Sequence, residues 1–411
     1  MITGKDIVVV GMQSWDITIG SNCKNIAWEL AKHNRVLYVN RALDRISAIR
    51  LRNEPDIQNR IKSLHGETDD IQQIAPQLWT LNPRTLLESA NWMPTALLFD
   101  LFNKINNKRI AKQVAIAMER LGFKDVVLFN DNDFFRNFYM QELLPGVQNT
   151  IYYIRDNLVS QPYFGKQGKR LEAKLMAKAD LVVANSAYLA DYARQHNPRS
   201  YDIGQGCEFE LFTKPEVPGR PAELDGISSP IIGYVGALLT SRLDISILEH
   251  IASARPDWNI VLVGPEDENF QASSLHNLPN VHFTGSKPVS MLPAFIHYFD
   301  VCINPQALNA MTVGNYPRKV DEYLAMGKPV VATETVAMQM FAPYTYLCRN
   351  AEEYVQQIGL ILSTPVSAEV VQNRIGFALS HTWENSVEEM SKHYFELPGR
   401  SRNNSRKAAA L

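Results

Sequence analysis

The chain has 411 residues, a length at which one hydrophobic core usually gives way to two domains. Hydrophobic residues make up 45% of it and charged residues 20%, as in soluble globular enzymes, and the formal net charge of −2 excludes a general electrostatic attraction for nucleic acid. No signal-peptide pattern and no apolar run of the ~20 residues that a membrane span needs is present. The four cysteines have neither metal-site nor disulfide spacing, which predicts reduced core thiols in a cytoplasmic protein: Cys23, Cys207, Cys302 and Cys348.

In the first half of the chain, short apolar runs alternate with helical patterns, which predicts βαβ units in a parallel sheet. The stretch from Arg41 to Asp100 has no clear period and is expected to hold loops with one or two helices. The expected strands are Asp6–Gly11, Val36–Asn40, Val126–Asn130, Thr150–Ile154, Leu181–Ala184 and Tyr201–Ile203. The expected helices are Ser21–His33, Leu101–Leu121 closed by Gly122, Gly168–Ala179 and one that starts at Ser186.

A segment rich in Pro and Gly, Pro215–Pro230, breaks every period and predicts a domain linker. Beyond it, strands are expected at 231–235, 259–263, 281–283, 301–304, 329–332 and 344–348, and helices at 244–254, 291–298, 317–326 and 352–362. The whole pattern predicts an α/β protein of two doubly wound Rossmann-like domains that face a cleft. The expected division is a first domain over 1–215, a linker over 216–230, a second domain over 231–381, a helix over 382–397 that crosses back, and a tail over 398–411 that resembles an expression-vector scar.

The most informative segment is Asn315–Thr333, with the sequence NYPRKVDEYLAMGKPVVAT. Pro317 suits the first turn of a helix, Gly327 suits its end, and the buried stripe would comprise Val320, Tyr323 and Leu324. Lys319 and Glu322 are three residues apart and share the other face. Two interpretations are open: the two side chains form a surface ion pair, or Glu322 binds a ligand whose anionic part lies at the helix start.

The same segment resembles the signature of glycosyltransferases of the GT-B fold, in particular the family 4 type (glycosyl transferases group 1), Pro-x-Lys-x-x-Glu-Tyr-Leu-Ala-x-Gly-x-Pro-Val-Val. The ten matching positions are Pro317, Lys319, Glu322, Tyr323, Leu324, Ala325, Gly327, Pro329, Val330 and Val331. The pattern is most similar to the branch that includes teichuronic-acid-type enzymes. In that family the Glu binds the ribose hydroxyls of a nucleotide-sugar, so the resemblance implies this role for Glu322.

The resemblance covers nearly the whole chain, strongly in the second half and weakly from Arg41 to Leu121. Ile232–Leu238 resembles the first strand and loop of the donor-binding domain. The resemblance implies that Arg242, which follows this segment, is a cation that binds the diphosphate, together with Lys319. The implied donor site comprises Arg242, Gly264, Gly285, Thr312, Gly314, Asn315, Lys319 and Glu322. The first domain is then the acceptor side.

One departure from the family concerns the sugar. Many members carry a second Glu eight positions upstream, near the donor sugar, where this chain has Gly314. The identity of the sugar and the retaining outcome are therefore open. In one interpretation, backbone N–H groups and short polar side chains hold the sugar; in the other, the same residues form an ordinary Asn/Gly turn: Asn309, Thr312, Gly314 and Asn315.

Four residues of the first half are expected beside the acceptor or the reaction centre. Trp15 and Asp16 lie in the loop after the first strand, although Trp15 also suits a residue that caps the core. Asp156 follows another strand and resembles a family Asp near the reaction centre, which implies a catalytic role; the alternative is a turn or capping residue. Asp131 begins an Asp-x-Asp tripeptide, the metal motif of the other large glycosyltransferase fold. Because the resemblance implies the metal-independent fold, Asp131 is expected on the acceptor side and no metal is expected.

The first half is also rich in basic residues, and its segment Trp92–Phe102 (WMPTALLFDLF) is apolar and aromatic. Together these features would suit a membrane surface, as a lipid-linked acceptor requires. The alternative is a solvated basic face beside a core helix. The basic residues are Arg41, Arg45, Arg50, Arg52, Arg60, Lys62, Lys104, Lys108, Arg109 and Lys112.

The resemblance thus implies a metal- and cofactor-independent, hexosyltransferase-type glycosyltransferase. It would move a sugar, with retention, from a UDP- or GDP-type nucleotide-sugar to a glycan or lipid-linked acceptor in cell-surface polysaccharide synthesis. The implied location is cytoplasmic, including the inner face of the membrane. Two alternatives remain: a nucleotide-sugar epimerase of the same fold, and a catalytically inactive subunit that binds nucleotide or carbohydrate. The first strand is not followed by Gly-x-Gly-x-x-Gly, which weighs against a dinucleotide oxidoreductase.

Overall fold

A computed structural model describes residues 1–16, 20–214 and 219–398, and the chain forms two compact units. The first unit comprises Met1–Gly204 and the described residues from Trp383 on, and the second comprises Gln205–Thr382. Part of the expected linker, 215–218, and the expected tail from 399 on lie outside the described residues. The second unit starts upstream of the expected linker because three side chains that the sequence places in the first domain pack into its core: Cys207, Phe209 and Phe212.

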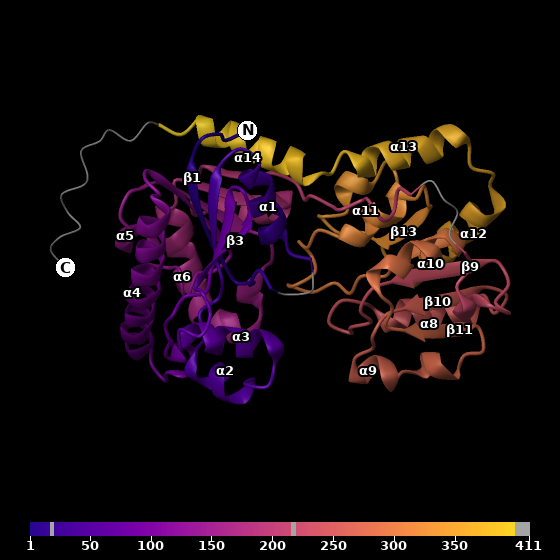
Figure 1. Ribbon diagram of the computed structural model, residues 1–411. Coiled ribbons are helices and arrows are strands. Elements are labelled where there is room, and N and C mark those ends of the chain that lie inside the picture. The colour runs from indigo at the N-terminus through magenta and orange to yellow at the C-terminus, as the bar shows by residue number, and fades with distance from the viewer. Residues whose placement is uncertain (17–19, 215–218, 399–411) are drawn as a thin grey trace. The chain divides into compact units, whose positions relative to one another are not determined.

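The first unit is built on an eight-stranded sheet of order β3-β4-β2-β1-β5-β6-β7-β8 (Figure 1). Its strands are β1 (Asp6–Gly11), β2 (Arg35–Val39), β3 (Ile71–Ala75), β4 (Leu78–Leu81), β5 (Val126–Asp131), β6 (Val147–Ile154), β7 (Leu181–Ala184) and β8 (Ser200–Asp202). Every neighbouring pair is parallel except β3 and β4. This antiparallel pair is absent from the predicted pattern because β3 is mostly exposed and has no apolar run.

Helices cover both faces of this sheet. The core on one face contains α1 (Asn22–Ala31) and α14 (Trp383–Phe395), and the cores on the other contain α4 (Ala96–Leu121), α6 (Pro162–Lys178) and α7 (Ala187–Arg194). As predicted, α4 ends at Gly122, which has a left-handed φ of 66°. The shorter helices are α2 (Arg45–Arg50), α3 (Pro55–Leu64), α5 (Met140–Leu143), η1 (Ala90–Trp92) and η2 (Leu158–Ser160).

The second unit contains a six-stranded, fully parallel sheet of order β11-β10-β9-β12-β13-β14 (Figure 1). Its strands are β9 (Ile231–Val235), β10 (Asn259–Val263), β11 (Val281–Gly285), β12 (Val301–Asn304), β13 (Val330–Thr333) and β14 (Tyr346–Cys348). This is the strand order of a doubly wound nucleotide-binding fold, and it reverses between β9 and β12. The predicted α/β class, with two doubly wound domains, is confirmed.

The helices of the second unit also lie on both faces of the sheet. The core on one face contains α8 (Ile245–Ala254) and α12 (Ala351–Ser363), and the core on the other contains α10 (Leu292–Tyr298), α11 (Arg318–Ala325) and α13 (Ala368–Leu379). The sequence does not predict α13, because only Arg374 and Ala378 of this helix are buried and no apolar stripe marks it. The short helices are α9 (Glu268–Gln271), η3 (Ala222–Leu224), η4 (Ser274–Asn277), η5 (Val289–Met291) and η6 (Gln339–Phe341).

All four cysteines are buried and unpaired, as the sequence predicts. Within the part of the chain that the structure describes, no helix combines the length and the apolar character that crossing a bilayer requires.

Candidate functional site

The strand reversal in the second unit brings two loops together at the carboxyl edge of the sheet. One loop follows β9 and the other follows β12. The backbone N–H of Asp244 donates to the Pro305 carbonyl at 2.9 Å, and the N–H of Ala307 donates to the Arg242 carbonyl at 2.9 Å. Crevices at such reversals are where doubly wound domains bind ligands, so this edge is the candidate site.

Helix α11 starts at this edge and is fixed to β9. The predicted buried stripe is confirmed, since Val320, Tyr323 and Leu324 are fully buried, and the Tyr323 hydroxyl accepts a hydrogen bond of 2.8 Å from the Val235 N–H. Pro317 occupies the position before the helix rather than its first turn, and no side chain caps the helix start. Of the first three backbone N–H groups of α11, that of Arg318 donates to the Tyr316 carbonyl at 3.2 Å and that of Val320 donates to the Pro317 carbonyl at 2.8 Å, so the Lys319 N–H is the one left for an anion.

Glu322 is half-buried and forms no ion pair or hydrogen bond with any residue that the structure describes. The ion-pair interpretation is wrong, because the Lys319 ammonium instead contacts the Tyr234 hydroxyl and lies 4.2 Å from the centre of the Tyr234 ring. Burial raises the pKa of Glu322, whereas the charges of Arg318 and Lys319 lower it. A partly desolvated carboxylate without donors is costly, so Glu322 has the properties of a ligand-binding group.

The neighbouring Asp321 has the opposite environment, since it is fully buried and three side chains surround it. Its Oδ1 lies 2.8 Å from His381 Nδ1, and its Oδ2 accepts hydrogen bonds from the Tyr316 hydroxyl at 2.7 Å and from Cys207 Sγ at 3.3 Å. The sequence does not reveal this network, because Cys207 and His381 lie far from Asp321 along the chain. Asp321 therefore stabilises the unit, whereas Glu322 remains free for a ligand.

Two glycines shape the loop that follows β9. Gly236 has φ of 140°, and a Cβ on it would lie 2.7 Å from the Lys319 ammonium. Gly264 has φ of 154°, and a Cβ on it would lie 2.0 Å from the Gly236 carbonyl oxygen. The predicted donor-site residue Gly264 thus allows two backbones to approach closely. Gly285, at the end of β11, has φ of 70° and faces open space.

The loop after β12 is held by its own side chains. The Asn309 amide oxygen accepts from the Thr312 N–H at 3.1 Å, and its amide nitrogen donates to the Ser241 carbonyl at 3.0 Å. The Thr312 hydroxyl donates to the Ala307 carbonyl, so Thr312 and Asn309 make the hydrogen-bonded turn of the second interpretation. Gly314 is buried and Asn315 is half-buried. The sugar contacts expected of this loop stay a prediction.

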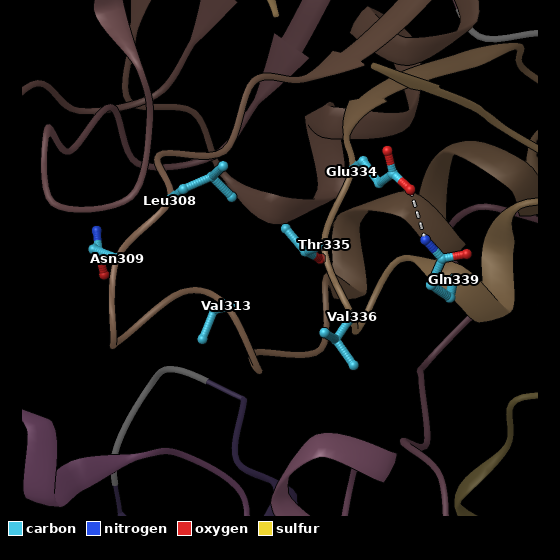
Figure 2. Close-up of a pocket in the computed structure, with 7 residues that line it drawn as sticks. All are labelled: Leu308, Asn309, Val313, Glu334, Thr335, Val336 and Gln339. Atoms are coloured by element: carbon cyan, nitrogen blue, oxygen red, sulfur yellow. Dashed lines mark hydrogen bonds between the residues drawn. The ribbon is translucent and has the colours of Figure 1, made fainter. Parts of the chain in front are cut away.

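Arg242, the predicted diphosphate cation, is exposed at the same edge, and its guanidinium has no ion-pair or hydrogen-bond partner in the described parts of the chain. A cavity of about 600 Å³ lies between the loop after β12 and the segment after β13 (Figure 2). In Figure 2, Leu308 and Thr335 face each other across this cavity. The Glu334 side chain points toward Gln339, whose amide nitrogen donates to the Glu334 carboxylate at 3.0 Å. The volume is in the range of small-molecule sites.

In the first unit, the predicted acceptor-side residues follow β1. Trp15 packs against the core and stacks on Trp28, with ring centres 6.2 Å apart, while its backbone N–H donates to the Asn40 side-chain oxygen at 2.7 Å. This is the core-capping environment of the alternative interpretation. Asp16 is exposed and pairs with Arg60 at 3.0 Å.

Asp131, predicted on the acceptor side, is instead fully buried, with its Oδ1 3.1 Å from Arg155 Nε. Its side chain faces Cys23 in the core rather than solvent. Burial lowers the pKa of Arg155, but the carboxylates of Asp131 and Asp156 raise it by more. The predicted catalytic Asp156 is half-buried beside this pair, where its N–H donates to Asn132 at 3.3 Å.

Asn132, which directly follows β5, has a strained left-handed backbone conformation, with a φ of 53°. Its amide nitrogen donates to the Glu172 carboxylate at 3.3 Å, and Glu172 also accepts from the hydroxyls of Tyr152 at 3.0 Å and Tyr192 at 3.1 Å. Burial raises the pKa of Glu172 to about 7, although these hydrogen bonds lower it. Among the described residues, no three His, Cys, Asp or Glu side chains gather as metal ligands do.

We expect Glu172 to make stability depend on pH. The pKa of Glu172 in the folded protein, about 7, exceeds the ordinary value of 4.5, so between these pH values the folded protein binds more protons than the unfolded chain. The folded protein therefore loses stability as pH rises through this interval, by at most about 1.4 kcal/mol per pH unit. The Glu172→Gln variant should remove that slope, measured by urea unfolding at pH 5, 6, 7 and 8. The exposed control Glu119→Gln should retain it; an unchanged slope in Glu172→Gln would contradict the assignment.

Comparison with known proteins relates the second unit to one family. Residues 229–364 match the family model of the glycosyl transferases group 1. TuaH of Bacillus subtilis (strain 168), whose name places it among glycosyltransferases of teichuronic acid biosynthesis, is 29% identical over 209 residues. This match covers 49% of the present chain and spans about half, 51%, of that relative.

Solved structures extend the likeness to the whole fold. A sucrose-phosphate synthase from Thermosynechococcus elongatus has a TM-score of 0.65 at 16% identity, covering 96% of this chain and 99% of that one. Anabaena HepE in complex with UDP has a TM-score of 0.64 at 14% identity, covering 96% of this chain and 100% of that one. HepE in complex with UDP-glucose has a TM-score of 0.62 at 14% identity, covering 95% of this chain and 99% of that one. These likenesses show the fold of GT-B glycosyltransferases.

Proposed function

We propose that this protein transfers a sugar from a nucleoside-diphosphate-sugar to a glycan or lipid-linked acceptor in polysaccharide synthesis. The proposal starts from the match of residues 229–364 to the glycosyl transferases group 1 family. The observation that carries the proposal is the pairing of an uncapped helix start with an unpartnered carboxylate, Glu322, at the strand reversal. The first feature suits a diphosphate and the second suits a pair of hydroxyls.

The donor would lie along α11. Its diphosphate would accept from the Lys319 N–H at the helix start, and Glu322, one turn further on, would accept hydrogen bonds from both ribose hydroxyls. The Arg318 side chain, whose Nε is buried without a hydrogen-bond partner among the described residues, adds positive charge there. We propose a UDP- or GDP-type donor; UDP and UDP-glucose are the ligands of HepE.

The proposed chemistry is stabilisation of the departing diphosphate. Lys319 is held against Gly236 and Arg242 is exposed on the adjoining loop, so both cations would neutralise negative charge as the glycosidic bond breaks. These cations and the helix start could replace a metal ion, and no other cofactor is needed for the step. The sugar would lie toward the loop that carries Gly314. In the first unit, Asp156 remains the predicted catalytic residue. Retention is proposed from the family alone.

We also propose that the enzyme works in the cytoplasm, including at the inner face of the membrane. The four free, buried thiols support a reducing compartment. The exposed apolar side chains at the start of α4 support contact with a lipid-linked acceptor, since Leu97 is 80% exposed.

One observation bears on the epimerase alternative, which needs an accessible acid or base. The second unit does contain a His–carboxylate pair, His381 and Asp321, but Asp321 is fully buried and Tyr316 shares both partners. This arrangement favours a structural role over proton transfer to a substrate.

An assay of nucleotide-sugars separates the three functions. The protein is incubated with UDP- and GDP-sugars, with and without glycan and lipid-linked acceptors, and nucleoside diphosphate release is followed. Acceptor-dependent release is the expected result. A changed sugar that remains attached to its nucleotide would show an epimerase, and tight binding without release from any donor would show an inactive binding subunit.

A further inference from the structure

The first unit also has a strand reversal, between β1 and β5, and two arginines meet beside it. Arg41 follows β2 and Arg136 follows β5, and both line two small cavities of about 130 and 100 Å³. Tyr163 and Phe135 line both cavities as well. Ligands of doubly wound domains bind at this edge, and cavities of this size admit a small group rather than a whole sugar chain.

Arg41 has no ion-pair partner among the residues that the structure describes. Its backbone N–H donates to Ser14 at 3.1 Å, but its half-buried guanidinium forms no ion pair or hydrogen bond with the residues that the structure describes. The like charge of Arg136 lowers the pKa of Arg41 to about 10, with burial as a further cause, while Asp133 and Asp44 raise it. Two neighbouring guanidinium groups, one of them unpaired, are typical of an anion site.

Other groups contact the nearby carboxylates, although Asp133 Oδ2 has no hydrogen-bond donor among the described residues. Asp44 accepts from the Ser47 and Ser89 hydroxyls at 2.7 and 2.8 Å. Asp133 accepts from the N–H groups of Phe135 at 3.0 Å and Arg136 at 2.9 Å, and its second oxygen lies 3.5 Å from the Arg136 guanidinium. These contacts fix the two carboxylates in place, so the Arg41 guanidinium is left for a ligand.

An exposed apolar surface adjoins the larger cavity. Trp92 and Tyr163 line that cavity while 67% and 51% exposed, and the Asn91 side chain fixes them together by donating to the Tyr163 carbonyl at 2.8 Å. Leu97 and Leu101, at the start of α4, are 80% and 56% exposed, and η1 packs against this helix. Their four-residue spacing places both on one face. An anion site beside exposed apolar side chains suits a ligand with a charged head and an apolar chain.

We propose that Arg41 and Arg136 bind the phosphate or diphosphate group of a lipid-linked acceptor, whose apolar chain lies against Trp92, Leu97, Leu101 and Tyr163. This inference rests on the proposed transferase function, since it names the acceptor that the first unit would hold. The doubly or more negatively charged phosphate group supplies the counter-charge for Arg41, while Arg136 also keeps its contact with Asp133, so no acidic residue needs to move.

Binding to the full-length protein tests the proposal, with farnesyl diphosphate, inorganic diphosphate and farnesol as probes, titrated calorimetrically in saturating UDP. Farnesyl diphosphate is expected to bind at least tenfold more tightly than inorganic diphosphate. Arg41→Gln and Arg136→Gln should each weaken the binding of farnesyl diphosphate about tenfold or more, whereas the exposed control Arg50→Gln should leave this affinity unchanged. Leu101→Ser should weaken the binding of farnesyl diphosphate several-fold and leave the affinity for inorganic diphosphate unchanged.

Unchanged affinity in both arginine variants would overturn the site, and equal affinity for the two diphosphates would overturn the lipid chain. Arg41→Lys, with melting followed by circular dichroism, separates a misfolded variant from a lost contact, because lysine keeps the charge but not the planar fork. UDP titration of the same preparations tests the transferase proposal separately. A chain that binds farnesyl diphosphate through Arg41 but no nucleotide-sugar would retain this site and lose the proposed function.

Discussion

The Glu322→Ala variant is expected to lose about 1–3 kcal/mol of nucleotide binding, or roughly 5- to 150-fold in Kd, while the protein keeps its stability. Glu322 has no partner among the described residues, so its removal deletes no internal contact. Burial raises the pKa of Glu322, which means that the folded unit disfavours its charge, and the variant should melt at the same or a slightly higher temperature.

Calorimetric titration with UDP and GDP, alongside thermal melting, measures both quantities. Glu322→Gln is the matched variant, because its amide oxygen accepts one ribose hydroxyl without charge, and an intermediate loss is expected. If a folded Glu322→Ala protein binds the nucleotide as tightly as the unaltered chain, the ribose assignment is wrong. The removal of an internal contact would instead appear as a lower melting temperature.

The Asp321→Ala variant, one residue away, should show the reverse pattern. Its carboxylate is fully buried and bonded to His381, Tyr316 and Cys207, so its removal leaves buried donors unsatisfied at a cost of about 3 kcal/mol. For a unit of this size, that corresponds to a fall in melting temperature of about 5 °C or more. Nucleotide affinity, measured well below the melting temperature, should change much less than in Glu322→Ala.

Asp321→Asn provides the control for shape, since it keeps the volume and one acceptor but replaces the other by a donor. It should retain part of the lost stability. A melting temperature of Asp321→Ala equal to that of the unaltered protein would contradict the structural role. A large loss of nucleotide affinity in a stable Asp321→Ala protein would show that Asp321, rather than Glu322, faces the ligand.

Local periodicity determines much of this fold from sequence. Most strands of both sheets, with β3 and β8 as exceptions, are apolar runs with turn residues at their ends. Gly122 and Gly327 end helices because only glycine readily adopts the left-handed backbone found there. The motif around Glu322 likewise identifies the second unit, because a Pro, a charged face and a closing Gly keep a fixed spacing within one short helix. Such features depend on residues close together in the chain.

Contacts between distant segments are decided by the tertiary structure alone. Lys319 and Glu322 are spaced as an ion pair, yet Lys319 contacts Tyr234 from another strand and leaves Glu322 unpartnered. Asp131 has the pattern of a surface metal motif, yet packing against the segment after β6 buries it. Burial and pairing depend on which chain segment covers a side chain, and neither residue type nor spacing specifies that neighbour. The roles of two adjacent carboxylates, one structural and one open to a ligand, therefore become distinct only when the folded second unit brings Cys207, Tyr316 and His381 around one of them.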